Sequence, residues 1–185
     1  VTWEDMGGKR WRVWLPEDRL EALERQLMVP LRQWVREGFL KLTEGDAIDY
    51  DAIEKQALKD CGFFNVQRIG YDRMFAGQLV QNVDRETKRG VVVEPIAQTF
   101  QGLSAGCKEM ERLLRSDGLR HGGHPVLRWH ASCVEVIADG NDNIRPVKPD
   151  RRKSSTRIDG IPASVQALSG YLRRPKSKSK VAVGF

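Results

Sequence analysis

The fold is decided by residues 66–72, which read Val66-Gln67-Arg68-Ile69-Gly70-Tyr71-Asp72. A short, largely apolar stretch that ends at a polar residue predicts a buried strand over 66–71. The strand delivers a carboxylate at its carboxyl end, which is the edge of an α/β sheet where functional sites collect. Asp72 is therefore a candidate site residue. The alternative is a structural role, in which Asp72 caps a helix expected over 73–83.

Strands and helices alternate on both sides of this stretch. Helical spacing of apolar residues predicts helices over 15–27, 30–37, 50–60, 73–83, 103–116, 125–132 and 158–172. Strands are expected over 9–14, 40–43, 66–71 and 91–94, and residues 134–137 and 144–147 are expected to form a hairpin around the turn at 139–143. The strand at 91–94 is apolar enough to predict cover on both faces. This order indicates a mixed α/β or α+β architecture.

The composition excludes several classes of protein. The chain has 185 residues, of which 40% are hydrophobic and 30% charged, as in ordinary globular domains. No apolar run approaches the roughly 20 residues of a membrane span, and the polar start at 1–5 does not resemble a signal peptide. Cys61, Cys107 and Cys133 lack the number and spacing of a disulfide framework, so we expect a reducing compartment.

Positive charge is concentrated near the end of the chain. The net charge is +6, and residues 151–180 hold nine basic side chains against a single acid, Asp159. A near-neutral body with a basic end favours a polyanionic partner, most simply nucleic acid. The alternative is a solubilising tail. From residue 175 onward the Lys/Ser repeat is expected to be flexible.

A second carboxylate also stands at the start of a predicted element. Asp159 lies in Thr156-Arg157-Ile158-Asp159-Gly160, which opens the last expected helix, so capping is again the structural alternative. If Asp72 and Asp159 converge, their hard oxygen atoms suit Mg²⁺ or Mn²⁺. Two such ions ~3.5–4 Å apart can clamp the attacking and leaving oxygens of a phosphodiester. Basic residues around Asp159 would then hold the phosphate backbone.

Another group of potential ligands comprises His121, His124, His130 and Cys133, four side chains at the short spacing that zinc sites use. The pattern lacks the paired cysteines of common zinc frames. The alternative is a glycine turn with two loop histidines and a buried Cys133. Neither a G-x4-G-K-[ST] phosphate loop nor a G-x-S-x-G nucleophile elbow occurs in the chain.

Beyond these single motifs, an ordered series from Trp14 to Leu172 resembles the nuclease half of the large terminase subunit of tailed bacteriophages. The series comprises W-L-P-E-D (14–18), V-P (29–30), Trp34, G-x-L-x-x-T-x-G (38–45), Ile48-Asp49, I-G-Y-D (69–72), Q-x-x-x-x-L-S (98–104), Lys108, H-x-G-x-P (121–125), Trp129, Asp142-Asn143, Lys148 and R-I-D-G-x-x-A (157–163). The resemblance implies an RNase H-like fold, in which a mixed central sheet is flanked by helices. It also implies a nuclease domain over 1–174 and a basic flexible tail over 175–185.

The resemblance further implies a metal-dependent endonuclease that cuts double-stranded DNA with two Mg²⁺ or Mn²⁺ ions. Asp72 matches the family's second catalytic acid and Asp159 its last. Lys148 matches a lysine ahead of that motif, which is expected to face phosphate. His121 fits the family pattern, whereas His124 stands where asparagine is usual. The backbone of the DNA would be positioned by Lys148, Arg151, Arg152, Lys153 and Arg157.

One departure from the family pattern concerns the first catalytic acid. In the family this aspartate lies on the first strand, and the chain begins after that point, so we expect the first strand to be lacking. Glu4 is the local candidate to complete the site. The implied partners are DNA, the ATPase half of the large terminase, the portal and the small terminase subunit, in the host cytoplasm and without a membrane.

Two other functions stay open on the sequence. One is a catalytically incomplete module that binds DNA or packaging partners. The other is a different RNase H-like nuclease or recombinase, which would prefer branched DNA.

Overall fold

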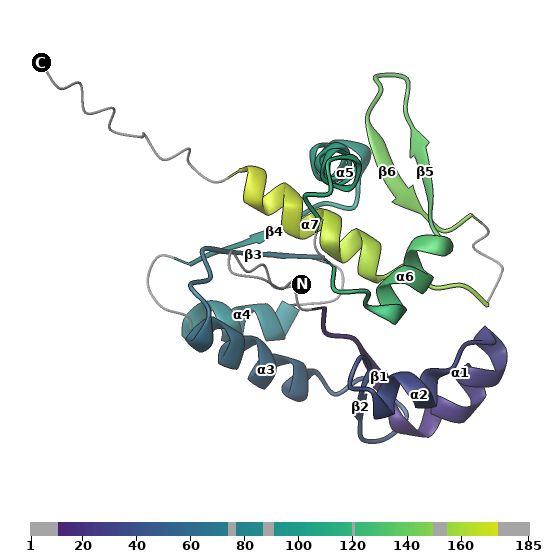
Figure 1. Ribbon diagram of the computed structural model, residues 1–185. Coiled ribbons are helices and arrows are strands. Elements are labelled where there is room, and N and C mark those ends of the chain that lie inside the picture. The colour runs from purple at the N-terminus through teal and green to yellow at the C-terminus, as the bar shows by residue number, and fades with distance from the viewer. Residues whose placement is uncertain (1–10, 74–76, 87–90, 120, 150–154, 174–185) are drawn as a thin grey trace, which may run out of the picture.

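The computed structural model describes residues 11–73, 77–86, 91–119, 121–149 and 155–173. Helices and strands alternate along these ranges (Figure 1). In order, the elements are β1 (Trp14–Pro16), a 3-10 turn η1 (Glu17–Arg19), α1 (Leu20–Leu27), α2 (Leu31–Arg36), β2 (Lys41–Thr43), α3 (Tyr50–Phe63), β3 (Arg68–Tyr71), α4 (Gly77–Glu86), β4 (Val92–Pro95), α5 (Phe100–Arg115), α6 (Pro125–Ser132), β5 (Glu135–Ala138), β6 (Ile144–Val147) and α7 (Gly160–Leu172).

The parallel pair β3–β4 lies at the centre of the domain. Ile69 is opposite Val93 and Tyr71 is opposite Pro95, so both strands end at the same edge. Helices α5 and α7 lie on one side of the pair and α3 and α4 on the other (Figure 1). Gly70 allows Ile96 to pack closely, because a Cβ at this position would stand 2.6 Å from the Ile96 side chain. The close packing fixes the end of β3, from which Asp72 projects.

The main core forms where α5 crosses α7. Leu103, Val165 and Leu168 are almost fully buried there, together with Ile96 after β4. Gly106 allows the two helices to approach, since a Cβ on it would come within 2.3 Å of the Val165 carbonyl oxygen. Burial of these side chains holds α7 against β3 and β4, and so sets the position of its first turn.

A second core joins β1, β2, α1 and α2. Leu27, Leu31, Trp34 and Leu40 form it with Val126 of α6. The next residue of α6, Leu127, belongs to the main core instead. Helix α6 therefore packs into both cores at once, which fixes it beside the start of α7.

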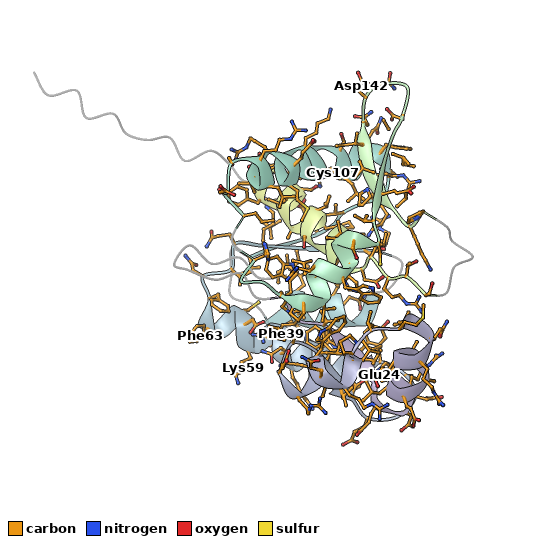
Figure 2. The ribbon with its side chains drawn as sticks, turned by 45° about the vertical axis from the view of Figure 1, so that its right-hand side comes forward. Glu24, Phe39, Lys59, Phe63, Cys107 and Asp142 are labelled. Carbon is orange, nitrogen blue, oxygen red and sulfur yellow. The ribbon has the colours of Figure 1, made fainter. Side chains whose placement is uncertain are left out.

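The predicted hairpin is present as the antiparallel pair β5–β6, with Ala138 opposite Ile144. The Asp139 carboxylate closes its turn by accepting hydrogen bonds from the backbone N–H groups of Asn141 and Asn143, each at 2.9 Å. Figure 2 shows Asp142 at the tip of this hairpin. Asp142 has a φ of 58°, a left-handed conformation that aspartate and asparagine tolerate.

Some expectations need correction. The strand expected over 9–14 lies partly outside the described residues, and β1 begins only at Trp14. Arg73, the first residue of the helix expected over 73–83, lies in a turn, and helix α4 is described from Gly77 onward. The expected cover on both faces of residues 91–94 is wrong, because Val92 is 41% exposed. Within the described ranges the strands form three two-stranded sheets, β1–β2, β3–β4 and β5–β6.

Cys61, Cys107 and Cys133 are free thiols, and burial raises the pKa of Cys107 to about 11. In the described part of the chain, every helix is too short or too polar to span a bilayer. The tail predicted over 175–185 lies outside the described residues.

Candidate active site between strand β3 and helix α7

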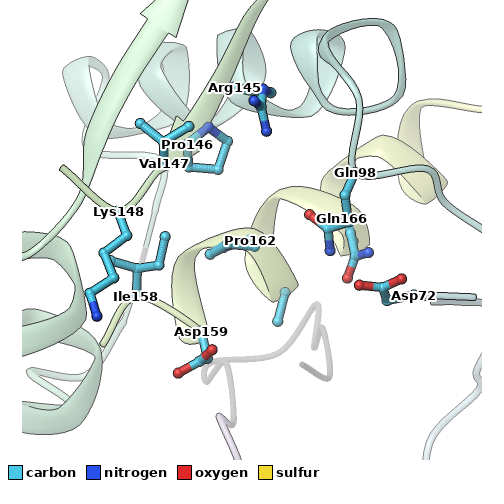
Figure 3. A pocket seen from close by; sticks show the side chains of 11 residues that line it. Asp72, Gln98, Arg145, Pro146, Val147, Lys148, Ile158, Asp159, Pro162 and Gln166 are labelled. Carbon is cyan, nitrogen blue, oxygen red and sulfur yellow. The ribbon is translucent and has the colours of Figure 1, made fainter. Parts of the chain in front are cut away.

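A hollow of about 350 Å³ opens between the end of β3, the loop after β4, strand β6 and the first turns of α7 (Figure 3). Its walls combine two carboxylates, two amides and two cations with small apolar side chains. The lining residues are Asp72, Gln98, Arg145, Pro146, Val147, Lys148, Ile158, Asp159, Pro162, Ala163 and Gln166. The two carboxylates are the predicted ones, although they come from distant parts of the sequence.

Asp72 is placed by strand β3. It follows Tyr71 directly and is half-buried in the wall of the hollow. Helix α4 is described from Gly77 onward, and residues 74–76 lie outside the described residues, so the capping alternative for Asp72 stays a prediction. The carboxylate lies at the carboxyl edge of a parallel strand pair, as sites in α/β folds commonly do.

Asp159 is placed by helix α7. It stands directly before the first helical residue, Gly160, with its side chain exposed at the hollow. Among the described residues, however, its carboxylate makes no capping hydrogen bond. The capping alternative is therefore wrong for Asp159. Figure 3 shows the Asp72 and Asp159 carboxylates along the same side of the hollow.

Two amide side chains stand beside the acids. Gln166 of α7 is 7% exposed, and its Nε2 donates to the Ile96 carbonyl oxygen at 3.3 Å. Gln98 lies three residues after the end of β4, and Figure 3 shows it near Gln166 and Asp72. The hydrogen bond to Ile96 fixes the Gln166 amide in the wall of the hollow.

Two cations also line the hollow. Arg145 of β6 places its guanidinium over the Phe100 ring, 4.8 Å from the ring centre. Its Nε is buried and has no hydrogen-bond partner among the described residues. Lys148 follows at the end of the same strand. Figure 3 shows both residues across the hollow from Asp72. An anion between the walls would meet cations already in place.

The donor set suits a hard cation. Asp72 and Asp159 offer carboxylate oxygens, which Mg²⁺ and Mn²⁺ prefer, and the neighbouring amides add neutral oxygen atoms. The described residues contain no group of three or more His, Cys, Asp or Glu side chains placed to hold a metal ion. Among the described residues that line the hollow, Asp72 and Asp159 are the two carboxylates. Glu4, the predicted third acid, lies outside the described residues.

The other predicted site residues divide into two groups. Arg157 and His121 are described, but neither is among the residues that line the hollow. Arg157 donates to the Thr156 carbonyl oxygen at 2.8 Å, and His121 Nδ1 accepts from the Gly123 N–H at 3.2 Å. Arg151, Arg152 and Lys153 lie outside the described residues.

The zinc alternative does not fit the geometry. His124 Nδ1 accepts from the Leu127 N–H at 3.4 Å and so caps α6, while His130 Nδ1 accepts from the Gly160 N–H at 3.0 Å. Burial lowers the pKa of both rings, that of His130 to about 4. Both histidines are therefore neutral at pH 7 and act as acceptors for the backbone. With Cys133 and His121 they form no metal-binding group in the described chain.

Sequence reasoning missed Gln98, Arg145 and Gln166. A signal existed for Gln98, because it follows the strand that pairs with β3 and opens the Q-x-x-x-x-L-S motif. The positions of Arg145 and Gln166 depend on how the hairpin and α7 pack, which no local pattern records.

Comparison with known families assigns the domain. The model of the family described as "Terminase large subunit, endonuclease domain" matches residues 13–174. The chain belongs to this family. The terminase endonuclease domain is 31% identical over 160 residues to the terminase large subunit of Enterobacteria phage HK97, covering 85% of this chain and 31% of that protein. It is also 28% identical over 162 residues to protein YmfN of Escherichia coli K12, covering 85% of this chain and 34% of YmfN.

The crystal structure of the HK97 bacteriophage large terminase has the same fold. The two chains superpose with a TM-score of 0.73 at 28% identity, covering 84% of this terminase endonuclease domain and 32% of the HK97 chain. This match confirms the predicted fold class, a mixed α/β domain of the RNase H-like terminase type. The chain spans about a third of the length of the relatives it matches.

Proposed function

We propose that this domain is a metal-dependent endonuclease that hydrolyses double-stranded DNA during phage DNA packaging. The observation that supports the proposal is the meeting of Asp72, Asp159, Arg145 and Lys148 in one hollow. Two carboxylates alone would repel the phosphates of DNA. Combined with the two cations of the same hollow, they suit a phosphodiester held by its charged oxygens.

Asp72 and Asp159 would hold the two divalent ions. When bound, Mg²⁺ or Mn²⁺ activates a water molecule for attack and stabilises the charge that develops on the phosphate. Gln166, fixed by its hydrogen bond to Ile96, would keep the wall of the hollow rigid. Rigid placement matters because catalysis of this kind depends on groups already in position.

Arg145 and Lys148 would bind the DNA backbone. Stacking on Phe100 holds the Arg145 guanidinium in one place, so little side-chain entropy is lost when it binds phosphate. Arg151, Arg152, Lys153 and Arg157 would extend the contact along the duplex. Because these contacts are made to phosphates, binding should be sequence-tolerant and salt-sensitive.

The setting of the reaction follows from the family. We propose that the domain works beside an ATPase half of the large terminase, with the portal and the small terminase subunit as further partners, in the host cytoplasm. Glu4 remains the candidate for a third acid.

Cleavage of supercoiled plasmid tests the proposal. Wild-type protein is incubated with Mn²⁺, Mg²⁺ or EDTA beside Asp72→Asn and Asp159→Asn. Each variant should lose roughly 100-fold or more of the metal-dependent nicking, because each removes one charged ligand. Asp142→Asn at the hairpin tip is the matched control, with the same change of charge outside the hollow, and should cleave like wild type. Full cleavage by both site variants would disprove the assignment.

A second candidate is a binding module without catalysis. It is favoured by the two carboxylates that the described residues supply, where the family uses three acids. Salt-dependent DNA binding without nicking in Mn²⁺ would support it. Preferential cleavage of four-way junctions over linear duplex would instead indicate a different RNase H-like nuclease.

A further inference from the structure

His130 lies between α6 and the first residue of α7. It is 3% exposed, and its Nδ1 accepts a hydrogen bond from the Gly160 N–H at 3.0 Å. The contact joins the end of α6 to the residue that follows Asp159. The ring does not line the hollow, so His130 has no direct contact with the proposed site of reaction.

Glycine at position 160 makes the close contact with His130 possible. A Cβ on Gly160 would stand 2.8 Å from His130 Nδ1 and 3.2 Å from the Leu127 side chain. The start of α7 is therefore pressed directly against the imidazole. A residue with a side chain at 160 would push the helix start away from the ring.

Each backbone N–H group in the first turn of α7 donates to an acceptor other than the Asp159 side chain. Gly160 N–H donates to His130, Ile161 N–H to the Ile158 carbonyl oxygen, and Ala163 N–H to the Asp159 carbonyl oxygen. Pro162 has no N–H. A helix start normally draws on the side chain of its N-cap residue for such donors, and aspartate is a preferred residue for that task.

We infer that His130 is a positioning residue for the active site: it takes the capping role at α7, and the Asp159 carboxylate is left turned to the hollow. The inference rests on the proposed function, since it gives the carboxylate its use there. Helix α6 is well suited to carry the ring, because it packs into both cores and begins with its own cap at His124. The ring is neutral, as its acceptor role requires.

Two substitutions of His130 separate positioning from mere structural support. The Asn Oδ1 lies as many bonds from the backbone as the His Nδ1, so His130→Asn can still accept from Gly160. The Gln Oε1 corresponds to Nε2, so His130→Gln fills the site better but moves the acceptor away. Asn leaves a larger cavity and should lower Tm more than Gln does.

The expected order for cleavage is the reverse of the order for stability. His130→Gln should lower metal-dependent cleavage about 10- to 100-fold, the usual effect of losing a group that orients a metal ligand, and should raise the Mn²⁺ concentration for half-maximal rate. His130→Asn should stay within a few-fold of wild type below its Tm. Activities that simply follow Tm would overturn the inference.

A readout that needs no cleavage keeps the two proposals distinguishable. In ¹⁵N-labelled wild-type protein, a through-hydrogen-bond coupling should join the Gly160 amide nitrogen to His130 Nδ1. The Gly160 amide resonance should move strongly in His130→Gln and little in His130→Asn. An absent coupling overturns the inference about His130, whereas an inactive wild type that retains the coupling overturns only the proposed function.

Discussion

Acidification should destabilise the domain through His130. Burial holds the pKa of its ring at about 4 in the folded protein, against an ordinary value of 6.5, while nearby Asp159 opposes the shift and His124 and Arg157 add to it. Between these two values the unfolded chain binds a proton that the folded chain does not. Stability is therefore fully present above pH 6.5 and is lost as the pH falls toward 4. From pH 7.5 to pH 5 the loss amounts to about 2 kcal/mol.

Urea unfolding followed by tryptophan fluorescence measures this loss at both pH values. His130→Asn cannot titrate at this position, so its stability should fall by about 2 kcal/mol less than that of wild type over the same interval. The other groups are common to both proteins and cancel in the comparison, as does the cost of the substitution itself. Equal losses in the two proteins would refute the claim that His130 is buried and neutral.

Three further predictions concern charge and packing. Arg145→Gln and Lys148→Gln should each weaken binding to duplex DNA and reduce the slope of log affinity against log salt by about 1, measured by fluorescence anisotropy. Gly106→Ala should cost about 1–3 kcal/mol in thermal or urea unfolding, because the new Cβ collides with the Val165 carbonyl oxygen and separates α5 from α7. Asp60→Asn should cost about 3 kcal/mol by the same assay, because it leaves the Arg12 guanidinium without its largely buried partner, to which it makes two hydrogen bonds.

The sequence predicted those parts of the fold that depend on local chemistry. Helix α3 begins at Tyr50 as predicted, and the Asp49 side chain caps it by accepting from backbone N–H groups. Helix α5 is present but begins at Phe100, three residues before the predicted start, because the Thr99 side chain caps it there. The turn chemistry around Asp139 predicted the hairpin. Both site acids were also predicted, because each follows or opens an element whose apolar pattern is clear.

Other features depend on contacts between distant segments. The described strands pair into three two-stranded sheets, which no local pattern records, and the exposed Val92 shows that an apolar run does not ensure burial. Arg145 joins the hollow only because the hairpin packs on α5 and seats the guanidinium over Phe100. His130 looked like a metal ligand by spacing, whereas its partner, Gly160, is brought to it by the packing of α6 on α7.

The most direct measurement is a Mn²⁺ titration of the ¹⁵N-labelled domain, read from the paramagnetic broadening of its amide resonances. Amides next to Asp72 and Asp159 should broaden first and over the same range of Mn²⁺ concentration, since the two carboxylates would hold the ions together. Asp159→Asn should reduce the broadening at both places, and Asp142→Asn should not. Broadening confined to the Asp139–Asp142 turn, or beginning at different concentrations beside Asp72 and Asp159, would contradict a shared metal site.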